Sequence, residues 1–154
     1  MKFFGTKYSA ISLLVLSLVL AVVAGNHFLK MRERKPIFAG PGVDQVKHLS
    51  DYAPELSNTP VNSKVFIMTG EKDGGTGLIL GGTHPNEPGG FLSAVTIVEN
   101  AELEKGKLIV IPRANPSGFS HTAPLEAAPQ FFSIPTPEGD REFRFGSRLT
   151  NPVH

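Results

Sequence analysis

The segment Gly81–Gly90, with the sequence GGTHPNEPGG, constrains the fold of this chain more than any other feature. It follows a short apolar run and precedes a pattern of apolar residues with helical spacing. It also places an imidazole and a carboxylate three positions apart, at His84 and Glu87. Side chains with this spacing can bind one zinc ion, and two-His-one-Glu sites leave a coordination position open for water. The segment therefore predicts a strand-to-helix connection that carries part of a zinc site.

Two apolar runs lead up to this segment and predict strands. They are residues 65–69 and 77–81, and the turn signal 70–75 lies between them, so we expect the two strands to be neighbours. The second run shows no alternation of apolar and polar residues, which is typical of a strand buried on both faces. His84 would then lie just beyond the carboxyl end of a strand, where open α/β sheets bind their ligands.

A helix and a third strand are predicted after the segment. Apolar residues at positions 91, 94, 95 and 98 share one helical face, and Pro88 suits the first helical position. Residues 107–111 form the third apolar run. A strand, a helix and a strand in this order form a right-handed parallel crossover in nearly all known cases. The sequence thus predicts an α/β domain.

The N-terminus is predicted to lie outside that domain. Residues 8–25 are almost entirely apolar, lysines precede them, and the basic segment 30–35 follows. A cationic start before an apolar run is typical of an export signal or a membrane anchor. Small residues before Gly25 offer a cleavage position, whereas the downstream positive charge favours an uncleaved anchor. We therefore expect residues 1–30 to be a signal anchor or a signal peptide.

Composition narrows the remaining possibilities. The chain has 154 residues, enough for one domain at most, and its net charge of +1 gives no indication of nucleic-acid binding. It has no cysteine, so disulfides and thiolate ligands are excluded and a metal site must use His, Asp or Glu. Residues 31–63 are rich in turn-forming residues and predict a linker with one short helical turn near Val43–Leu49. Residues 64–154 would then form the domain.

Other interpretations of the glycine-rich segment remain open. In the simplest one, Glu87 only caps the helix and His84 is a loop residue. A glycine-rich turn before a helix also binds phosphate in some proteins, but the sequence endings typical of such loops are missing. In the zinc interpretation the helix dipole keeps the carboxylate ionised, as a metal ligand must be. The flanking glycines would let backbone and substrate approach closely.

The residues Gly81-Gly82-Thr83-His84-Pro85-Asn86-Glu87 resemble a motif of the succinylglutamate desuccinylase/aspartoacylase family, within the wider zinc carboxypeptidase-like group. The usual form is Gly-Gly-Thr-His-Gly-Asn-Glu, and here Pro85 replaces the glycine that follows the histidine. Ala114-Asn115-Pro116 resembles the Asn-Pro pair that follows the next strand in that family. The resemblance covers roughly Lys64–Phe119. It implies the N-terminal part of a mixed sheet with flanking helices, and Zn²⁺ bound by the motif's His and Glu.

Later parts of the family pattern are not recognisable. These are an Asp-Leu-Asn-Arg-like segment, a third zinc ligand on a strand and a glutamate that serves as general base. The resemblance therefore implies an incomplete catalytic domain, with His121 and His154 as the only later histidines. Arg148 is our choice for binding a substrate carboxylate, because arginine binds carboxylates bidentately. Arg113, Arg141 and Arg144 are the other candidates, and the alternative is that these arginines belong to a surface strand or loop with ion pairs.

The resemblance also implies a reaction. A zinc-bound water and a glutamate base would hydrolyse the amide bond of a small N-acyl amino acid or a similar molecule. A zinc carboxypeptidase acting on peptides would use the same chemistry. An inactive membrane-anchored fragment and a metal-free binding module are the alternatives from other classes. The expected partners are this small substrate and a membrane, and the sequence does not predict an oligomeric state.

Overall fold

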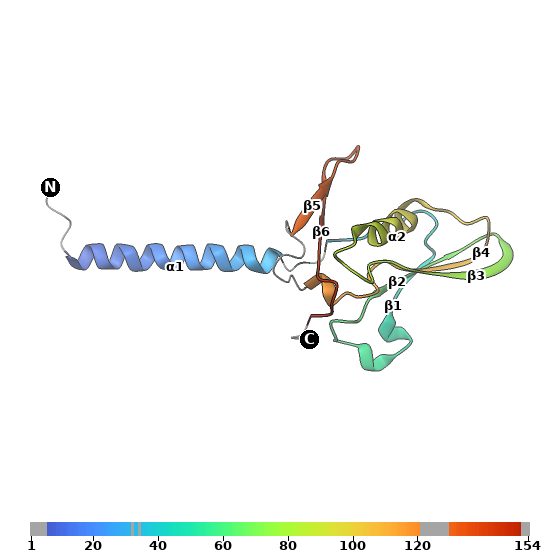
Figure 1. Cartoon of the computed structure of the whole chain (residues 1–154), viewed down its shortest axis with the longest axis horizontal. Helices are drawn as coiled ribbons and strands as arrows, with labels where there is room; N and C mark the ends of the chain where they lie inside the picture. The colour runs from blue at the N-terminus through green and yellow to red at the C-terminus, as the bar shows by residue number, and fades with distance from the viewer. Residues whose placement is uncertain (1–5, 32, 34, 121–129, 152–154) are drawn as a thin grey trace. The chain divides into compact units, whose positions relative to one another are not determined.

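The computed structural model describes residues 6–31, 33, 35–120 and 130–151. They belong to two compact units, one up to Arg34 and one from Lys35 onward. Figure 1 shows the helices and strands of both units. The chain is a mixed α/β protein that begins with an apolar helix, as the sequence predicts.

Helix α1, Thr6–Met31, makes up most of the first unit. Its stretch Lys7–Lys30 is long and apolar enough to cross a membrane. At 1.5 Å per residue these 24 residues rise about 36 Å, more than a hydrocarbon core of roughly 30 Å. A signal sequence meets the same description, so α1 suits either anchoring or export.

A four-stranded mixed sheet and one helix form the centre of the second unit (Figure 1). In chain order they are β1 Gln45–His48, β2 Lys64–Thr69, β3 Lys72–Leu80, α2 Pro88–Asn100 and β4 Lys105–Ile111. The order of strands in the sheet is β1-β2-β4-β3. β3 and β4 are parallel because α2 connects them, whereas β2 is antiparallel to both β1 and β4.

Helix α2 forms where the spacing of apolar residues predicts it. Its buried residues are the four expected from the sequence: Phe91, Ala94, Val95 and Val98. They join one hydrophobic core with Phe66, Met68 and Val110 of the sheet. Burying a side chain such as phenylalanine or valine contributes roughly 1.5–3 kcal/mol. This face therefore fixes α2 on the sheet, and with it the loop that precedes α2.

The positions of β2 and β3 in the sheet differ from the prediction. They are not neighbours, although a turn signal joins them, because β4 lies between them. The connection crosses the end of β4, where Gly70 N bonds Gly106 O and Lys72 N bonds Glu104 O. The crossover through α2 makes β3 and β4 partners, so β2 pairs with the other side of β4.

Strand β3 is also not buried on both faces, contrary to the prediction. It lies at an edge of the sheet, and Leu78 and Leu80 are 60% and 54% exposed, whereas Ile79 packs against the core. The run lacks alternation because both of its faces are apolar. Only one of these faces is covered by the described residues.

Residues 36–63, predicted to be part of a linker, belong to the second unit. They contain β1 and two short 3₁₀ turns, Leu49–Asp51 and Pro54–Leu56. The segment is also held by Gly40 N, which donates to Val98 O of α2 at 3.1 Å. Backbone pairing of this kind does not depend on apolar side chains, so a turn-rich composition conceals it.

A two-stranded antiparallel hairpin lies beside α2. It consists of β5 Phe131–Ile134 and β6 Arg141–Arg144. The Phe143 ring lies 6.0 Å from the Phe91 ring of α2, edge to face, and 5.8 Å from the Phe132 ring. Aromatic pairs of this kind contribute about 0.5–1.5 kcal/mol beyond the area they bury. Strands of four residues are too short for an alternating pattern to be evident in the sequence.

Candidate metal centre

The loop between β3 and α2 carries the predicted zinc ligands. Gly81 N donates to Ile111 O at 2.9 Å, which extends the ladder of β3 and β4 by one residue. His84 therefore lies just beyond the carboxyl end of β3. Glu87 N then donates to His84 O at 2.9 Å and closes a tight turn before α2 begins.

The side chains of His84 and Glu87 face each other across this turn. His84 Nδ1 lies 3.3 Å from Glu87 Oε2, and the two side chains are 38% and 60% exposed. Two ligands about 2.1 Å from one zinc ion lie about 3.4 Å apart in tetrahedral geometry. When Nδ1 carries a proton, the same contact is a weak hydrogen bond. The pair thus has the spacing of two ligands of one ion, and both side chains can be reached from solvent.

Glu87 stands at the N-cap position of α2, but its carboxylate does not cap the helix. Its backbone has φ −112° and ψ 83°, and its side chain makes no capping hydrogen bond. The carboxylate contacts His84 instead. The simple interpretation of Glu87 as a helix cap therefore does not describe its side chain, although the helix dipole still favours a negative charge at this position.

The segment around Asn115 packs directly against this loop. Ala114 N donates to Gly81 O at 2.8 Å, and Asn115 N donates to Gly82 O at 3.2 Å. The Asn115 side chain donates from Nδ2 to Thr83 O at 3.4 Å and accepts from Gly118 N at 3.0 Å. The two segments that carry the resemblance are thus in contact, although about 30 residues of chain separate them. Asn115 holds the backbone just before His84.

Gly82 is required by packing within the loop. Its φ is +61°, and a Cβ there would lie 2.8 Å from Pro112 O and 2.9 Å from the Phe119 ring. A Cβ at Gly81 would lie 2.6 Å from the Ala94 side chain, whereas Gly89 and Gly90 face open space. Gly81 and Gly82 therefore let the loop approach α2 and the end of β4 closely. Their role in the described structure is in packing.

These features can be compared with those of known proteins. No family model, curated protein or solved structure matches this chain. The resemblance of the loop to a zinc-hydrolase motif therefore rests on the residues quoted above and on their geometry.

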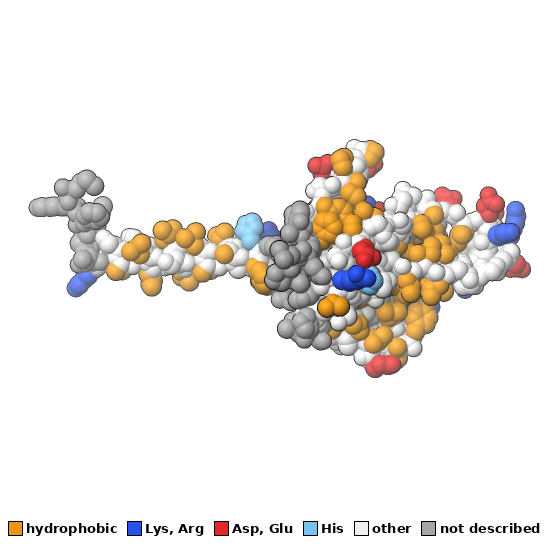
Figure 2. Space-filling view, viewed as in Figure 1, with side chains coloured by type: hydrophobic (Ala, Val, Ile, Leu, Met, Phe, Trp, Pro, Cys, Tyr) orange, Lys and Arg blue, Asp and Glu red, His pale blue; other side chains and the backbone are white. Residues whose placement is uncertain are grey.

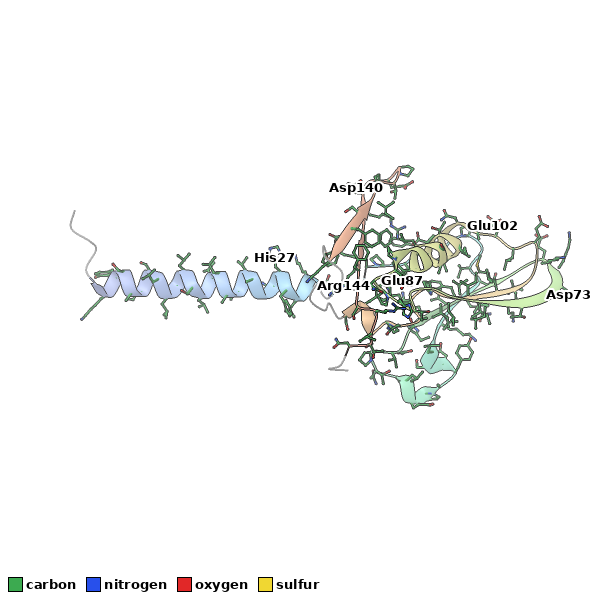
Figure 3. All side chains as sticks on the ribbon, viewed as in Figure 1. His27, Asp73, Glu87, Glu102, Asp140 and Arg144 are labelled. Atoms are coloured by element: carbon green, nitrogen blue, oxygen red, sulfur yellow. The ribbon has the colours of Figure 1, made fainter. Side chains whose placement is uncertain are left out.

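Arg144, the last residue of β6, adjoins this loop. Gly146 N donates to Pro85 O at 3.3 Å, which ties the end of the hairpin to the motif. Figure 3 shows Arg144 next to Glu87, and Figure 2 shows a basic, an acidic and a histidine side chain meeting on this face. The Arg144 guanidinium also lies 5.5 Å from the centre of the Phe131 ring. This arrangement brings a positive charge to the edge of the candidate site.

The other arginines considered for substrate binding have different surroundings. Arg148, the choice from sequence, is exposed and follows the hairpin by four residues. Arg113 donates to Lys35 O at 2.6 Å and stacks on the Phe91 ring at 5.3 Å. Arg141 binds both carboxylate oxygens of Glu99, at 2.5 and 3.0 Å. The last two arginines are thus engaged in holding the fold together.

The hydrogen bonds from Arg141 to Glu99 raise the pKa of the guanidinium above its ordinary value. A cation with a raised pKa contributes its stabilisation at every pH below its unfolded-state pKa and loses it only in strong alkali.

Arg141 and Glu99 form part of the wall of a cavity of about 460 Å³ between α2 and the β5–β6 hairpin. Neither His84 nor Glu87 lines that cavity. It is therefore separate from the candidate metal centre.

A third zinc ligand is not evident in the part of the chain that the structure describes. Among those residues, no group of three or more His, Asp or Glu side chains could hold a metal ion together. His48 ends β1 and is exposed, and His27 lies in α1. The two later histidines considered from sequence, His121 and His154, lie outside the described residues.

Proposed function

We propose that this chain carries part of the active site of a zinc-dependent amide hydrolase, similar to the succinylglutamate desuccinylase/aspartoacylase family, with a zinc carboxypeptidase-like fold. The observation that carries the proposal is the 3.3 Å distance between His84 Nδ1 and Glu87 Oε2 at the end of β3. The contact of Asn115 with Thr83 supports it, because it joins the two segments on which the resemblance rests. Helix α1 would hold the enzyme at a membrane.

Each residue has a defined role in this proposal. His84 and Glu87 hold the zinc, which when bound polarises the substrate carbonyl and lowers the pKa of a bound water. Arg144 binds the carboxylate of an N-acyl amino acid, since a guanidinium matches a carboxylate with two parallel hydrogen bonds. Asn115 fixes the loop backbone so that His84 keeps its orientation. A third ligand and a general base would come from residues outside the described part of the chain.

The test is zinc binding by the full chain in detergent, measured by calorimetry and atomic emission. We expect His84→Ala and Glu87→Gln to weaken zinc binding by at least about tenfold. Replacing a residue that only supports a metal ligand already costs about 10–100-fold in metal affinity. His48→Ala is the matched control, because it removes an exposed histidine of β1, which is the edge strand of the sheet opposite β3. Zinc affinity that is equal in the His84, His48 and unmodified chains would refute the proposal.

A substrate panel separates the two hydrolase alternatives once zinc binding is established. An N-acyl amino acid and a peptide with a free carboxyl end are offered to the same zinc-loaded protein. Preference for the N-acyl amino acid supports the deacylase, and preference for the peptide supports the carboxypeptidase.

A further inference from the structure

The cavity between α2 and the β5–β6 hairpin lies apart from the candidate metal centre, and its lining residues all belong to the second unit. Its volume of about 460 Å³ is within the range of roughly 300–1,000 Å³ that is typical of sites for small molecules. Its apolar lining comes from the segment before β1, from α2 and from the hairpin: Phe38, Leu92, Val95, Ile134, Pro137 and Phe143. A lining of this kind suits a ligand with an apolar body.

The charges around this cavity are mostly negative. Among the described lining residues, Glu99, Glu138 and Arg141 are charged. Arg141 donates hydrogen bonds to both carboxylate oxygens of Glu99, so these two charges neutralise each other. Glu138 is exposed in the hairpin turn, and its carboxylate lies 3.3 Å from the Thr136 hydroxyl. That hydroxyl makes a shorter bond, of 2.7 Å, to Gly139 O, so the Glu138 carboxylate keeps most of its capacity to accept.

The C-terminal end of α2 adds to this negative potential. Thr96, Glu99 and Asn100 line the cavity, and residues 97–100, the last turn of the helix, contain no basic side chain. A helix C-terminus carries a partial charge of about −0.5, which favours a cation nearby. The Asn100 side chain donates to Thr96 O at 3.0 Å, which leaves its carbonyl oxygen to accept from a ligand.

The Phe38 ring provides a surface against which a cation can lie. Arg141 stacks on two rings, at 5.4 Å from the centre of Phe38 and 5.1 Å from that of Phe143. Phe143 is buried, whereas Phe38 is 59% exposed, so much of the Phe38 ring remains open to a ligand. The face of an aromatic ring attracts ammonium groups. The cavity thus combines an apolar wall, an open aromatic ring and an excess of negative charge.

We propose that this cavity is a second binding site, which takes an organic ammonium cation with an apolar body. The apolar body packs against the side chains of α2 and the hairpin, and the ammonium group is held by Glu138, the Phe38 ring and the end of α2. An anion would meet these charges unfavourably, because Glu99 already neutralises Arg141. The site is independent of the proposed hydrolase function, since neither His84 nor Glu87 lines it.

Three probes with the same ring and nearly the same length test this assignment, because they differ in charge: phenethylammonium, 2-phenylethanol and 3-phenylpropionate. Each is titrated into the ¹⁵N-labelled full chain in a non-ionic detergent, and amide chemical shifts report binding along the chain. We expect phenethylammonium to shift amides within residues 96–100 and 134–138 in a saturable way. The alcohol lacks both the ion pair and the cation–π contact, so it should bind roughly tenfold more weakly, and the carboxylate more weakly still.

Two substitutions with matched controls locate the site. Glu138→Gln should weaken phenethylammonium binding by roughly two- to fivefold, the contribution of an exposed ion pair, and leave binding of the alcohol unchanged. Asp140→Asn (Figure 3) removes the same charge two residues along, outside the cavity lining, and should have a smaller effect. Thr96→Trp fills the cavity from an exposed position of α2 and should abolish binding, whereas Ser93→Trp adds the same side chain outside the lining.

Three results would overturn the assignment. They are the absence of saturable shifts with phenethylammonium, an affinity for the alcohol or the carboxylate that equals that for the ammonium, and binding that Thr96→Trp leaves unchanged. If a tryptophan variant does not fold, the comparison of Glu138→Gln with Asp140→Asn decides, because both change only exposed groups of the hairpin. Zinc takes no part in these measurements, so loss of zinc binding would count against the proposed function alone.

Discussion

The Glu87 carboxylate stands at the start of α2 without using the helix amides beside it. A serine at an N-cap accepts from these amides and stabilises helices by about 0.5–2 kcal/mol relative to residues that do not. We therefore expect Glu87→Ser to raise the free energy of unfolding by about 0.5–1 kcal/mol while it abolishes zinc binding. Urea denaturation measures the first effect and calorimetry the second. Glu102→Ser, outside the helix, should change neither.

A gain in stability together with a loss of zinc would mean that Glu87 is kept for chemistry at the expense of stability. If Glu87→Ser lowered the free energy of unfolding, the carboxylate would have a structural role that its described contacts do not account for.

Replacement of Arg144 and replacement of Arg148 are expected to change substrate affinity to different extents. A hydrogen bond to a charged group contributes about 1.5–3 kcal/mol, so Arg144→Gln should weaken binding of an N-acyl amino acid by about tenfold or more. Arg148→Gln is the comparison, because it removes the same charge four residues along the chain. Chemical shifts of the ligand during titration report both affinities. A larger loss in Arg148→Gln would restore the choice made from sequence.

The contact between His84 and Glu87 could be predicted because it is local. Only two residues lie between them, and the turn between strand and helix alone brings them together. The position of Arg144 beside this loop could not be predicted, since it depends on a hairpin that returns to the loop after almost 60 residues. Nothing in its own neighbourhood of charged and aromatic residues distinguishes it from Arg141 or Arg148.

At the scale of elements, the loop before α2 depends on the backbone conformation of Gly82. Alanine there would adopt a strained positive φ and would place its Cβ against Pro112 O and the Phe119 ring. We expect Gly82→Ala to lower the free energy of unfolding by more than about 1 kcal/mol. Gly89→Ala, in the first turn of α2 with open space around it, should leave stability unchanged or raise it by up to about 1 kcal/mol.

Urea denaturation of the two glycine variants measures this difference, since both substitutions add one methyl group. Equal effects would mean that the loop adapts to a side chain at position 82, and that His84 is held less firmly than the structure indicates.

Elements with a strong helical period were predictable, and edge strands were not. The buried face of α2 follows directly from positions 91, 94, 95 and 98, because every turn of the helix returns to the core. The sequence of β3 does not distinguish a central strand from an edge strand, since that depends on which strand β4 pairs with. β1 was missed because its turn-rich sequence is held by backbone bonds to β2.

At the scale of the whole molecule, membrane association and cooperative unfolding are expected to depend on different units. Deleting residues 1–34 removes α1 and leaves the contacts of Lys35 in place. The shortened protein should therefore leave the membrane fraction and keep the cooperative unfolding of the second unit. Sedimentation with vesicles and thermal unfolding measure these two properties. Continued sedimentation with vesicles would show that another surface binds lipid.

The exposed edge of β3 has a consequence for how the protein behaves in concentrated solution. From Gly74 to Gly82 the strand has no charged residue and no proline, which are the usual obstacles to unwanted strand pairing. Among the described residues no strand pairs with the outer edge of β3, so its amides and carbonyls there, with Leu78 and Leu80 beside them, form a template on which a further strand can be added. If one specific strand pairs with that edge, the sheet is extended in an ordered way. If strands of other molecules pair with it, the protein aggregates.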